Sequence, residues 1–125
     1  MRRALVLGAA LAACAPEDPS ITLLLPTDGA TVCGTPLTFE IAVTGRRLEA
    51  PPADPKDAGP RTGHVDVLLN GQDAAMVWED AGEIKDVDDG RYLLEVELSN
   101  GDHSPVVPYT ADSVTIDVAA AACGG

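Results

Sequence analysis

The chain has 125 residues, and its 8 Lys and Arg stand against 20 Asp and Glu, which gives a formal charge of −12 at pH 7. A chain of this length forms one domain at most, and its acidity excludes nucleic acid as a partner, because affinity for a phosphate backbone depends on clustered Lys and Arg. A hydrophobic share of 46% is that of an ordinary globular domain and argues against wholesale disorder.

The N-terminal segment has the pattern of an export signal. Residues 1–3 carry two arginines, and residues 4–13 form an apolar run about half as long as a helix needs to cross a bilayer. A positive start, a short apolar stretch and small residues before a cleavage site are typical of a signal peptide. The Leu-Ala-Ala-Cys sequence from Leu11 to Cys14 resembles the lipobox of bacterial lipoproteins.

The lipobox resemblance implies that the peptide is cut before Cys14, whose sulfur receives a diacylglycerol and whose new amine is acylated. Two or three acyl chains hold a soluble domain firmly on a membrane. The competing interpretation is a plain secretory signal with an incidental cysteine. We therefore expect a signal peptide at residues 1–13, a lipidated cysteine and tether at residues 14–19 and a folded domain at residues 20–125.

Cleavage would leave 112 residues with 6 Lys and Arg against 20 Asp and Glu, a charge of −14. Because this charge opposes contact with anionic lipid, we expect the lipid on Cys14 to be the only membrane contact. Any further partner is an unknown protein or envelope component. Ala15 stands where many lipoproteins retained in inner membranes have Asp, so by analogy we expect the outer membrane, facing the periplasm or the exterior.

The three cysteines divide into one lipid site and one pair. If Cys14 carries lipid, Cys33 and Cys123 remain, one near the start of the folded domain and one near its end. An exported protein lies in an oxidising compartment, which favours a disulfide between them. The alternatives are two free thiols or a metal pair, although two isolated cysteines without a Cys-x-x-Cys spacing make a poor zinc site.

Apolar residues at every second position predict β-strands along most of the mature chain. The clearest strand is at residues 37–44, and the same period marks residues 21–25, 65–69, 92–98 and 114–118. No mature segment has a 3.6-residue period over more than two turns, so we expect helix to be a minor component. Residues 119–122, all alanine, predict either a helical turn or an extension of the last strand.

Turn residues separate these strands. Asn70-Gly71 predicts a hairpin between residues 65–69 and 74–78, because both turn positions of that type need positive φ. Asp89-Gly90 and Asn100-Gly101 bracket the strand that contains Tyr92 in the same way. About seven short strands with turns at this spacing predict an all-β antiparallel sandwich.

A long segment between the early strands has a different composition. Residues 45–63 contain four of the ten prolines, with charged residues between them. This composition predicts one long exposed loop, because proline cannot donate to a strand ladder and the charges favour water. We expect the loop to be the surface that the domain presents to a partner.

The C-terminal third resembles a known class of domain. Gly90, Tyr92, Leu94 and Val96, followed by a final Val-x-Ile-x-Val strand, are similar to the last two strands of immunoglobulin-like and fibronectin type III-like domains. The resemblance covers about residues 20–119. It implies an immunoglobulin-like antiparallel β-sandwich of about seven strands, in which Tyr92 occupies the place of a tyrosine corner.

The same resemblance bears on the cysteines. In that topology part of the first strand runs parallel to the last strand, so the two strands end at the same pole of the sandwich. Cys33 and Cys123 follow those two strands. The expected fold and the expected disulfide therefore support each other.

A narrower resemblance lies in Gly63-His64-Val65-Asp66 together with Asp102-His103 and a closing Ser-Val-x-Ile strand. This set is similar to a group of uncharacterised bacterial secreted domains that have a Gly-His-x-His strand and an Asp-His loop. Asp66 stands where that group often has its second histidine, and Tyr92 where it often has a third.

These residues raise the hypothesis of a metal site. His64 begins one strand and His103 lies in the loop before the last strand, two connections that cluster at one end of an immunoglobulin-like sandwich. Two imidazoles with Asp66 or Asp102 as a third ligand suit zinc or copper. The competing interpretation places His64 and Asp66 on the water-facing side of their strand and His103 in a polar turn.

An acidic stretch at residues 79–89 is a weaker candidate for calcium. The spacing of its acids misses that of an EF-hand loop. The competing interpretation is a solvated hairpin that turns at Asp89-Gly90. The acids concerned are Glu79, Asp80, Glu83, Asp86, Asp88 and Asp89.

Catalysis finds little support in the sequence. A Ser-His-Asp set would have to use Ser104 or Ser113, in a loop without nucleophile-elbow glycines, and no glycine-rich phosphate loop is present. Trp78 alternates with Ala74 and Met76, and we predict that it packs in the core.

Together these observations favour a non-catalytic membrane-anchored lipoprotein without a cofactor, which acts as an extracytoplasmic binding or interaction module. The alternative is a periplasmic copper- or zinc-binding protein that uses His64 and His103.

Overall fold

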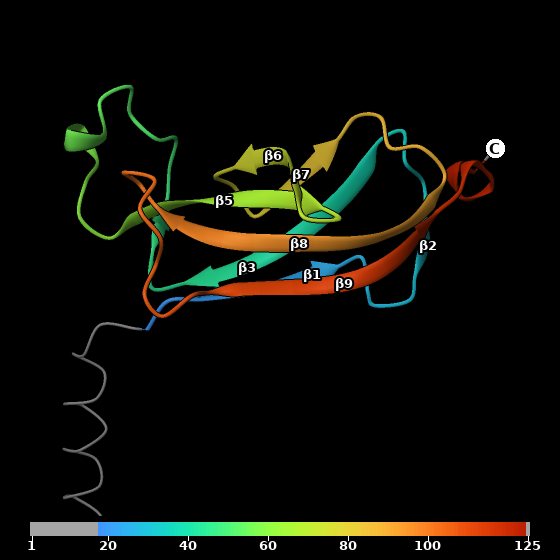
Figure 1. Ribbon diagram of the computed structural model, residues 1–125, viewed down its shortest axis with the longest axis horizontal. Coiled ribbons are helices and arrows are strands. Elements are labelled where there is room, and N and C mark those ends of the chain that lie inside the picture. The colour runs from blue at the N-terminus through green and yellow to red at the C-terminus, as the bar shows by residue number, and fades with distance from the viewer. Residues whose placement is uncertain (1–17, 125) are drawn as a thin grey trace, which may run out of the picture.

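Alternating apolar residues produce strands with one buried face, and these strands form the two sheets in Figure 1. The computed structural model describes residues 18–124. The first sheet has the order β1-β3-β7, with the bounds β1 Ser20–Leu25, β3 Leu37–Thr44 and β7 Ala81–Ile84. The second has the order β2-β9-β8-β5-β4, with β6 also paired to β5. Its strands are β2 Thr31–Val32, β4 Arg47–Leu48, β5 Thr62–Leu69, β6 Gln72–Val77, β8 Gly90–Asn100 and β9 Ala111–Val118.

The structure confirms the all-β class. Among residues 18–124 the nine strands include two of only two residues, β2 and β4, and the helical elements are two short 3-10 turns. These turns are η1 Pro55–Asp57 and η2 Ala120–Cys123, so the alanines at the C-terminus form a helical turn. None of the helical segments in this part of the chain has the length and apolar character that crossing a bilayer requires.

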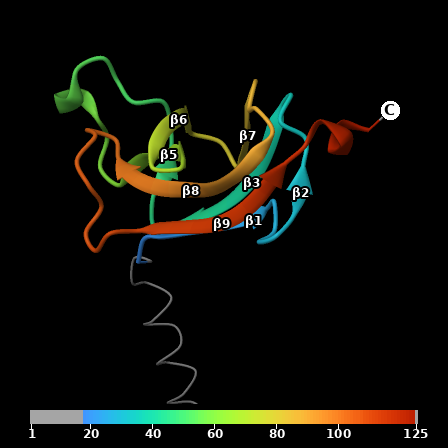
Figure 2. The same cartoon turned by 45° about the vertical axis from the view of Figure 1, so that its right-hand side comes forward.

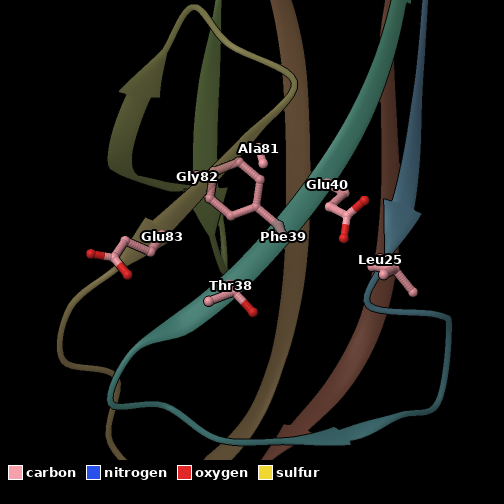
Figure 3. Close-up of a pocket in the computed structure, with 7 residues that line it drawn as sticks. All are labelled: Leu25, Thr38, Phe39, Glu40, Ala81, Gly82 and Glu83. Atoms are coloured by element: carbon pink, nitrogen blue, oxygen red, sulfur yellow. The ribbon is translucent and has the colours of Figure 1, made fainter.

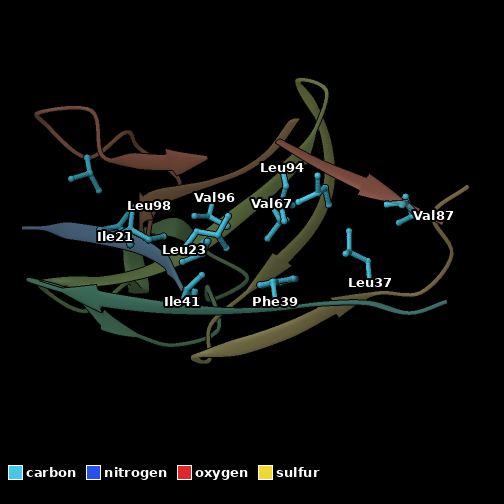
Figure 4. Packing of buried hydrophobic residues seen from close by; sticks show 14 residues of the cluster. Ile21, Leu23, Leu37, Phe39, Ile41, Val67, Val87, Leu94, Val96 and Leu98 are labelled. Atoms are coloured by element: carbon cyan, nitrogen blue, oxygen red, sulfur yellow. The ribbon is translucent and has the colours of Figure 1, made fainter. Parts of the chain in front are cut away.

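The core lies between the two sheets (Figure 4). Along β3 the buried residues Leu37, Phe39 and Ile41 alternate with exposed Thr38 and Glu40, as the two-residue period predicts. The opposing sheet contributes the inward residues of its three long strands, Val65, Val67, Leu94, Val96, Leu98, Ile116 and Val118. Side chains of two inner faces that interdigitate in this way are the usual core of a β-sandwich.

The pole that carries the C-terminus is closed by a disulfide. β2 runs parallel to β9, with Val32 opposite Val118. The expected parallel pairing with the last strand is therefore made by this separate strand, while the predicted first strand, β1, pairs with β3. Cys33 directly follows β2 and forms a disulfide with Cys123, which lies 90 residues later in η2. Both sheets, the core and this disulfide lie within residues 18–124.

The Asn70-Gly71 hairpin is also confirmed. Asn70 has a φ of 51° and Gly71 a φ of 81°, the left-handed pair that a two-residue hairpin requires, and the flanking strands β5 and β6 pair antiparallel. The Asn70 side chain accepts a hydrogen bond of 2.8 Å from the Leu93 N–H, which ties the turn to the neighbouring strand β8.

The other two predicted hairpin turns were wrong. β7 belongs to the three-stranded sheet and β8 to the six-stranded sheet, so residues 85–89 cross from one sheet to the other and Asp89-Gly90 is no hairpin turn. Asn100-Gly101 ends β8, but residues 101–110 form a long connection before β9. β7 itself was missed, because its four residues lie within the acidic stretch and are only half-buried or exposed.

The tyrosine corner that the resemblance implied is present. The Tyr92 hydroxyl donates a hydrogen bond of 2.8 Å to the Asp88 carbonyl, four residues back along the chain. This bond fixes the connection that brings the chain from β7 into β8, and it lies near the disulfide pole.

At the opposite pole the described chain begins. Figures 1 and 2 show the start of β1, the connection at residues 45–61 and the connection at residues 101–110 at this same end of the sandwich. The predicted loop at residues 45–63 is largely irregular and carries only β4 and η1 before β5 begins at Thr62.

Candidate functional site

The fold brings the two histidines together at the pole where the chain begins. His64 is the third residue of β5, and His103 lies in the connection between β8 and β9. Their ring centroids are 4.9 Å apart and the rings are inclined by 62°. His103 takes a left-handed φ of 70° within a turn that its N–H closes on the Asn100 carbonyl. The predicted meeting of the two histidines therefore takes place.

His64 does not face water as predicted, since its exposed fraction is 0%. It lies on the outer face of the six-stranded sheet, opposite Ser99 of β8. The connection after β8 folds back over this place, because Ser99 forms a β-bridge with Pro105 and the Asn100 N–H donates to the Ser104 carbonyl. The outer face of the strand end is thereby covered.

Burial leaves the His64 ring without hydrogen bonds. Neither ring nitrogen has a partner within the described part of the chain, and the Nε2 atom lies 3.7 Å from the Asp66 Oδ1 atom, too far for a hydrogen bond. Removal from water lowers the pKa of His64; the Asp66 carboxylate opposes this shift, and His103 adds to it. The neutral imidazole is therefore the favoured form in the fold.

Asp66 sits two residues along the same face and is partly buried, with 28% of its side chain exposed. Burial raises the pKa of Asp66, the nearby His64 lowers it, and the carboxylates of Asp73 and Glu97 raise it further. Glu97 is its direct cross-strand neighbour on β8. The outer face of the sheet therefore concentrates negative charge beside the histidine pair.

The Asp102 side chain forms hydrogen bonds within its own turn. Its Oδ1 atom accepts hydrogen bonds from the N–H and the hydroxyl of Ser104. The side-chain hydrogen bond from Ser104 is the main cause that lowers the pKa of Asp102. Its carboxylate thus stabilises the turn that carries His103.

The predicted metal-site residues do not complete a ligand set. Within residues 18–124 no three His, Cys, Asp or Glu side chains are placed to hold a metal ion, which applies both to the histidine pair and to the acidic stretch at residues 79–89. Zinc and copper sites need at least three protein ligands around the ion. The copper or zinc hypothesis therefore has no complete site among these residues.

The outer face of β8 carries a cluster that the sequence did not reveal. The Tyr109 hydroxyl donates to the Glu97 carboxylate at 2.8 Å and lies 3.3 Å from that of Glu95. The hydrogen bond to Glu97 is the main cause that raises the pKa of Tyr109 to about 12. Glu95 and Glu97 share one face of β8 by the strand period, but Tyr109 comes from the following connection, and no local pattern links it to them.

Trp78 corrects another prediction. It is 42% exposed, and Met76 on the same face is 40% exposed, so both lie outside the core. The inward face of β6 is the one that carries Ala75 and Val77, which pack against the core. Apolar residues occupy both faces of this strand, so periodicity alone could not identify the buried one.

A shallow hollow lies on the outer side of the three-stranded sheet, between β3 and β7 (Figure 3). The Phe39 ring belongs to the buried core and lies close to Gly82, where a Cβ atom would lie 2.7 Å from the Phe39 Cζ atom. Glu40 and Glu83 lie on opposite sides. Its lining residues are Leu25, Thr38, Phe39, Glu40, Ala81, Gly82 and Glu83, which include no histidine, cysteine or serine.

Comparisons with known proteins bear on the fold. No protein-family model and no curated protein sequence matches the chain. Among solved structures, the fibronectin(III)-like modules of Clostridium thermocellum CbhA match 81% of this chain with a TM-score of 0.55 and 19% sequence identity. The chain spans 46% of that structure, about half its length.

Two further solved structures are more distant. An engineered protein matches 84% of this chain and 21% of its own, with a TM-score of 0.49 and 15% identity. The PKD domain from human KIAA0319 matches 84% of this chain and 86% of its own, with a TM-score of 0.43 and 13% identity. We base the fold assignment on the CbhA modules and on the strand order. The chain has the fold of a fibronectin type III-like, immunoglobulin-like β-sandwich.

Proposed function

We propose that this protein is a lipid-anchored, extracytoplasmic interaction module without catalytic activity. Its anchor would be a lipid on Cys14, after removal of a signal peptide at residues 1–13, and these residues lie outside the described part of the chain. The folded domain would stand outside the cytoplasm on that anchor. Fibronectin type III-like sandwiches are generally non-catalytic modules, which agrees with the assignment.

One observation carries the extracytoplasmic part of the proposal. The disulfide between Cys33 and Cys123 uses both cysteines of the folded domain and leaves Cys14 for the lipid. Disulfides persist in oxidising compartments and are rare in the cytosol. A stable bridge therefore supports export, which is also what the lipobox implies.

The surface for a protein partner would be built from the outer face of the six-stranded sheet. That face presents the carboxylates of Glu95 and Glu97 beside exposed Tyr109. Aromatic side chains with a polar group are enriched in protein interfaces, because they bury a large apolar area and still form hydrogen bonds. An envelope protein is the kind of partner that such a face suits.

The test is the intact mass of the protein extracted from membranes with detergent. We expect a chain that starts at Cys14 and carries two or three acyl groups. The Cys14→Ser variant, which offers no thiol for lipid, should appear in the soluble fraction without acyl mass. An unmodified Cys14 in the membrane-extracted protein would overturn the anchor, and two free thiols at Cys33 and Cys123 would overturn the extracytoplasmic assignment.

A further inference from the structure

The few cations of this acidic chain are unevenly placed. Of its eight Lys and Arg, two lie in residues 1–3, and four of the other six lie between residues 46 and 61. These four are Arg46, Arg47, Lys56 and Arg61. The positive charge of the folded domain is thus concentrated in one connection, which also contains three acids, Glu49, Asp54 and Asp57, and has a net charge of +1.

Three of these arginines line one open hollow. Arg46 and Arg47 come from the start of the connection and Arg61 from its end, and the hollow they share has no Asp or Glu among its lining residues. A backbone hydrogen bond of 2.9 Å from the Arg47 N–H to the Arg61 carbonyl holds the two ends of the connection together. The fold therefore gathers three guanidinium groups that lie up to 15 positions apart in the sequence.

Arg46 is held by neutral partners. Its Nε atom donates to the Asn100 side-chain oxygen at 2.9 Å, and its Nη1 atom donates to the Gly45 carbonyl at 2.7 Å. An amide and a carbonyl fix the direction of the guanidinium group without cancelling its charge. Arg47 is 73% exposed and lies 3.6 Å from the Glu49 carboxylate, a surface pair that contributes little.

The hollow adjoins the point where the described chain begins. The Thr44 hydroxyl, on its rim, donates to the Asp18 carbonyl at 3.2 Å. Gly45 is packed so closely on Pro19 that a Cβ atom there would lie 2.6 Å from the Pro19 backbone. Figures 1 and 2 show the connection and the start of β1 at the same end of the molecule.

The length of the tether limits how far the hollow can lie from the membrane. Three residues lie between Cys14 and Asp18, and the four Cα-to-Cα steps of a fully extended chain span at most about 14 Å. If Cys14 carries lipid, the hollow lies within a short distance of the headgroup layer. Screening at physiological salt acts over about 8 Å, so acids at the far end of the domain oppose this attraction little, whereas Glu49, Asp54 and Asp57 in the same connection reduce it.

We propose that the hollow lined by Arg46, Arg47 and Arg61 binds the phosphate groups of anionic membrane lipids, so that the domain stands on its membrane with this pole down. Guanidinium groups match phosphate oxygens with paired hydrogen bonds, which makes arginine the side chain of choice for such contacts. The inference rests on the proposed anchor, and it replaces the expectation that lipid on Cys14 is the only membrane contact. The disulfide pole and its loops then point away from the membrane.

The first experiment uses the full lipidated protein reconstituted into vesicles of phosphatidylcholine, with or without phosphatidylglycerol. Phenylglyoxal modification of each arginine is followed by mass spectrometry. We expect phosphatidylglycerol to slow modification of Arg46 and Arg47, and high salt to restore it. Arg91, which pairs with Asp117 at the opposite end of the sandwich, is the internal control and should not change. Equal rates in the two lipid compositions would overturn the proposal.

The second experiment separates the hollow from the anchor. It uses residues 14–125 with Cys14→Ser, which contain both sheets, the core and the disulfide, and measures binding to phosphatidylglycerol vesicles by co-sedimentation. Replacing Arg46 and Arg47 by Gln should weaken binding roughly 30-fold, since each basic residue near an anionic surface contributes about a fivefold factor. Replacing Lys85 and Arg91 by Gln removes the same charge elsewhere and should have a much smaller effect. Equal losses in the two double variants would overturn the assignment to the hollow.

A third arm tests the source of the phosphate. At matched ionic strength, inorganic phosphate should displace the soluble chain from vesicles only slightly better than chloride does, because the free anion offers one phosphate group and the vesicle offers many. Complete displacement by inorganic phosphate would identify a site for a free anion and overturn the membrane assignment. If Cys14 is acylated and the two double variants bind equally, the proposed anchor holds and the assignment of lipid binding to the hollow is wrong. If Cys14 is unmodified and the double variants differ clearly, the anchor is wrong and the assignment to the hollow holds.

Discussion

His64 is the single side chain whose surroundings matter most for how the domain responds to pH. The ring is fully buried and has no hydrogen-bond partner in the described chain, which is unusual for a buried polar group. Burial lowers its pKa, so the folded state disfavours the charged imidazolium. The unfolded chain, in contrast, lets His64 ionise near its ordinary pKa of about 6.5.

The first prediction follows from this difference. Above the pKa of the unfolded state, His64 is neutral in both the folded and the unfolded chain, and its titration does not affect stability. Below about pH 6.5 the unfolded chain binds a proton at His64 that the folded chain does not bind, so the free energy of unfolding falls. The raised pKa of Asp66 acts in the opposite sense. Urea unfolding over a pH series should show this fall in the wild type.

Two variants check the assignment. His64→Gln removes the titrating group and should flatten the dependence between pH 5 and pH 7, the range in which an ordinary histidine titrates. His103→Gln, in the same cluster but on the exposed side, should keep a fall of the same sign. If the free energy of unfolding of His64→Gln still falls between pH 7 and pH 5, another group causes the pH dependence.

The two tyrosines form a matched pair for a second prediction. Tyr92→Phe removes the hydrogen bond to the Asp88 carbonyl and should lower the free energy of unfolding by about 1 kcal/mol. Tyr109→Phe removes a bond to Glu97, but Tyr109 is 63% exposed and water replaces its hydroxyl, so stability should hardly change. Equal losses in chemical denaturation would contradict the role of Tyr92 as a corner.

At the level of elements, the β5–β6 hairpin is set by its two-residue turn. Both turn residues have left-handed φ, and the Asn70 side chain ties the turn to Leu93 of β8. A Cβ atom added at Gly71 would meet nothing within 4 Å, so any effect of a substitution there comes from the backbone. The register of the outer-face residues depends on this turn.

The third prediction concerns Gly71, where an added Cβ atom would contact no other residue. Gly71→Ala should lower the free energy of unfolding by about 1 to 2 kcal/mol, because a residue with a Cβ atom is disfavoured in the left-handed region. Gly71→Asn should cost clearly less, since Asn tolerates this region better than Ala. Thermal and urea denaturation of the two variants measure the difference. An equal loss of stability in both variants would show that the left-handed backbone of Gly71 is not the cause.

On the scale of the whole molecule, the disulfide joins the beginning and the end of the folded domain. It closes a loop of 90 residues, from the end of β2 to η2. Without it, the parallel pairing with β9 would rest on the two residues of β2 and a few hydrogen bonds. The bridge therefore restricts the unfolded chain over nearly the whole length of the domain.

The fourth prediction concerns its loss. Replacing Cys33 and Cys123 by Ser should lower the free energy of unfolding by about 4 to 5 kcal/mol, the chain-entropy value for a loop of this length. Reducing agent should destabilise the wild type by a similar amount and leave the double variant unchanged. A double variant as stable as the oxidised protein would show that the fold does not depend on the bridge.

The sequence by itself determined the strands that have one clear face. In β1, β3, β5, β8 and β9 every second residue is apolar over five or more positions, and this local pattern identifies a half-buried strand without knowledge of its partners. It also determined the Asn70-Gly71 turn, whose dihedral angles are a property of two adjacent residues. Cysteine number and compartment were enough to propose the pair that the fold then joins.

Only the tertiary structure decided the burial of His64, because the connection that covers it lies about 40 residues later in the chain. It also decided that Trp78 lies outside the core, since β6 is apolar on both faces and its pairing with β5 determines which face is buried. The arginine hollow likewise needs the two ends of one connection side by side. Local pattern specifies which residues can be buried, whereas contacts between distant segments specify which of them are.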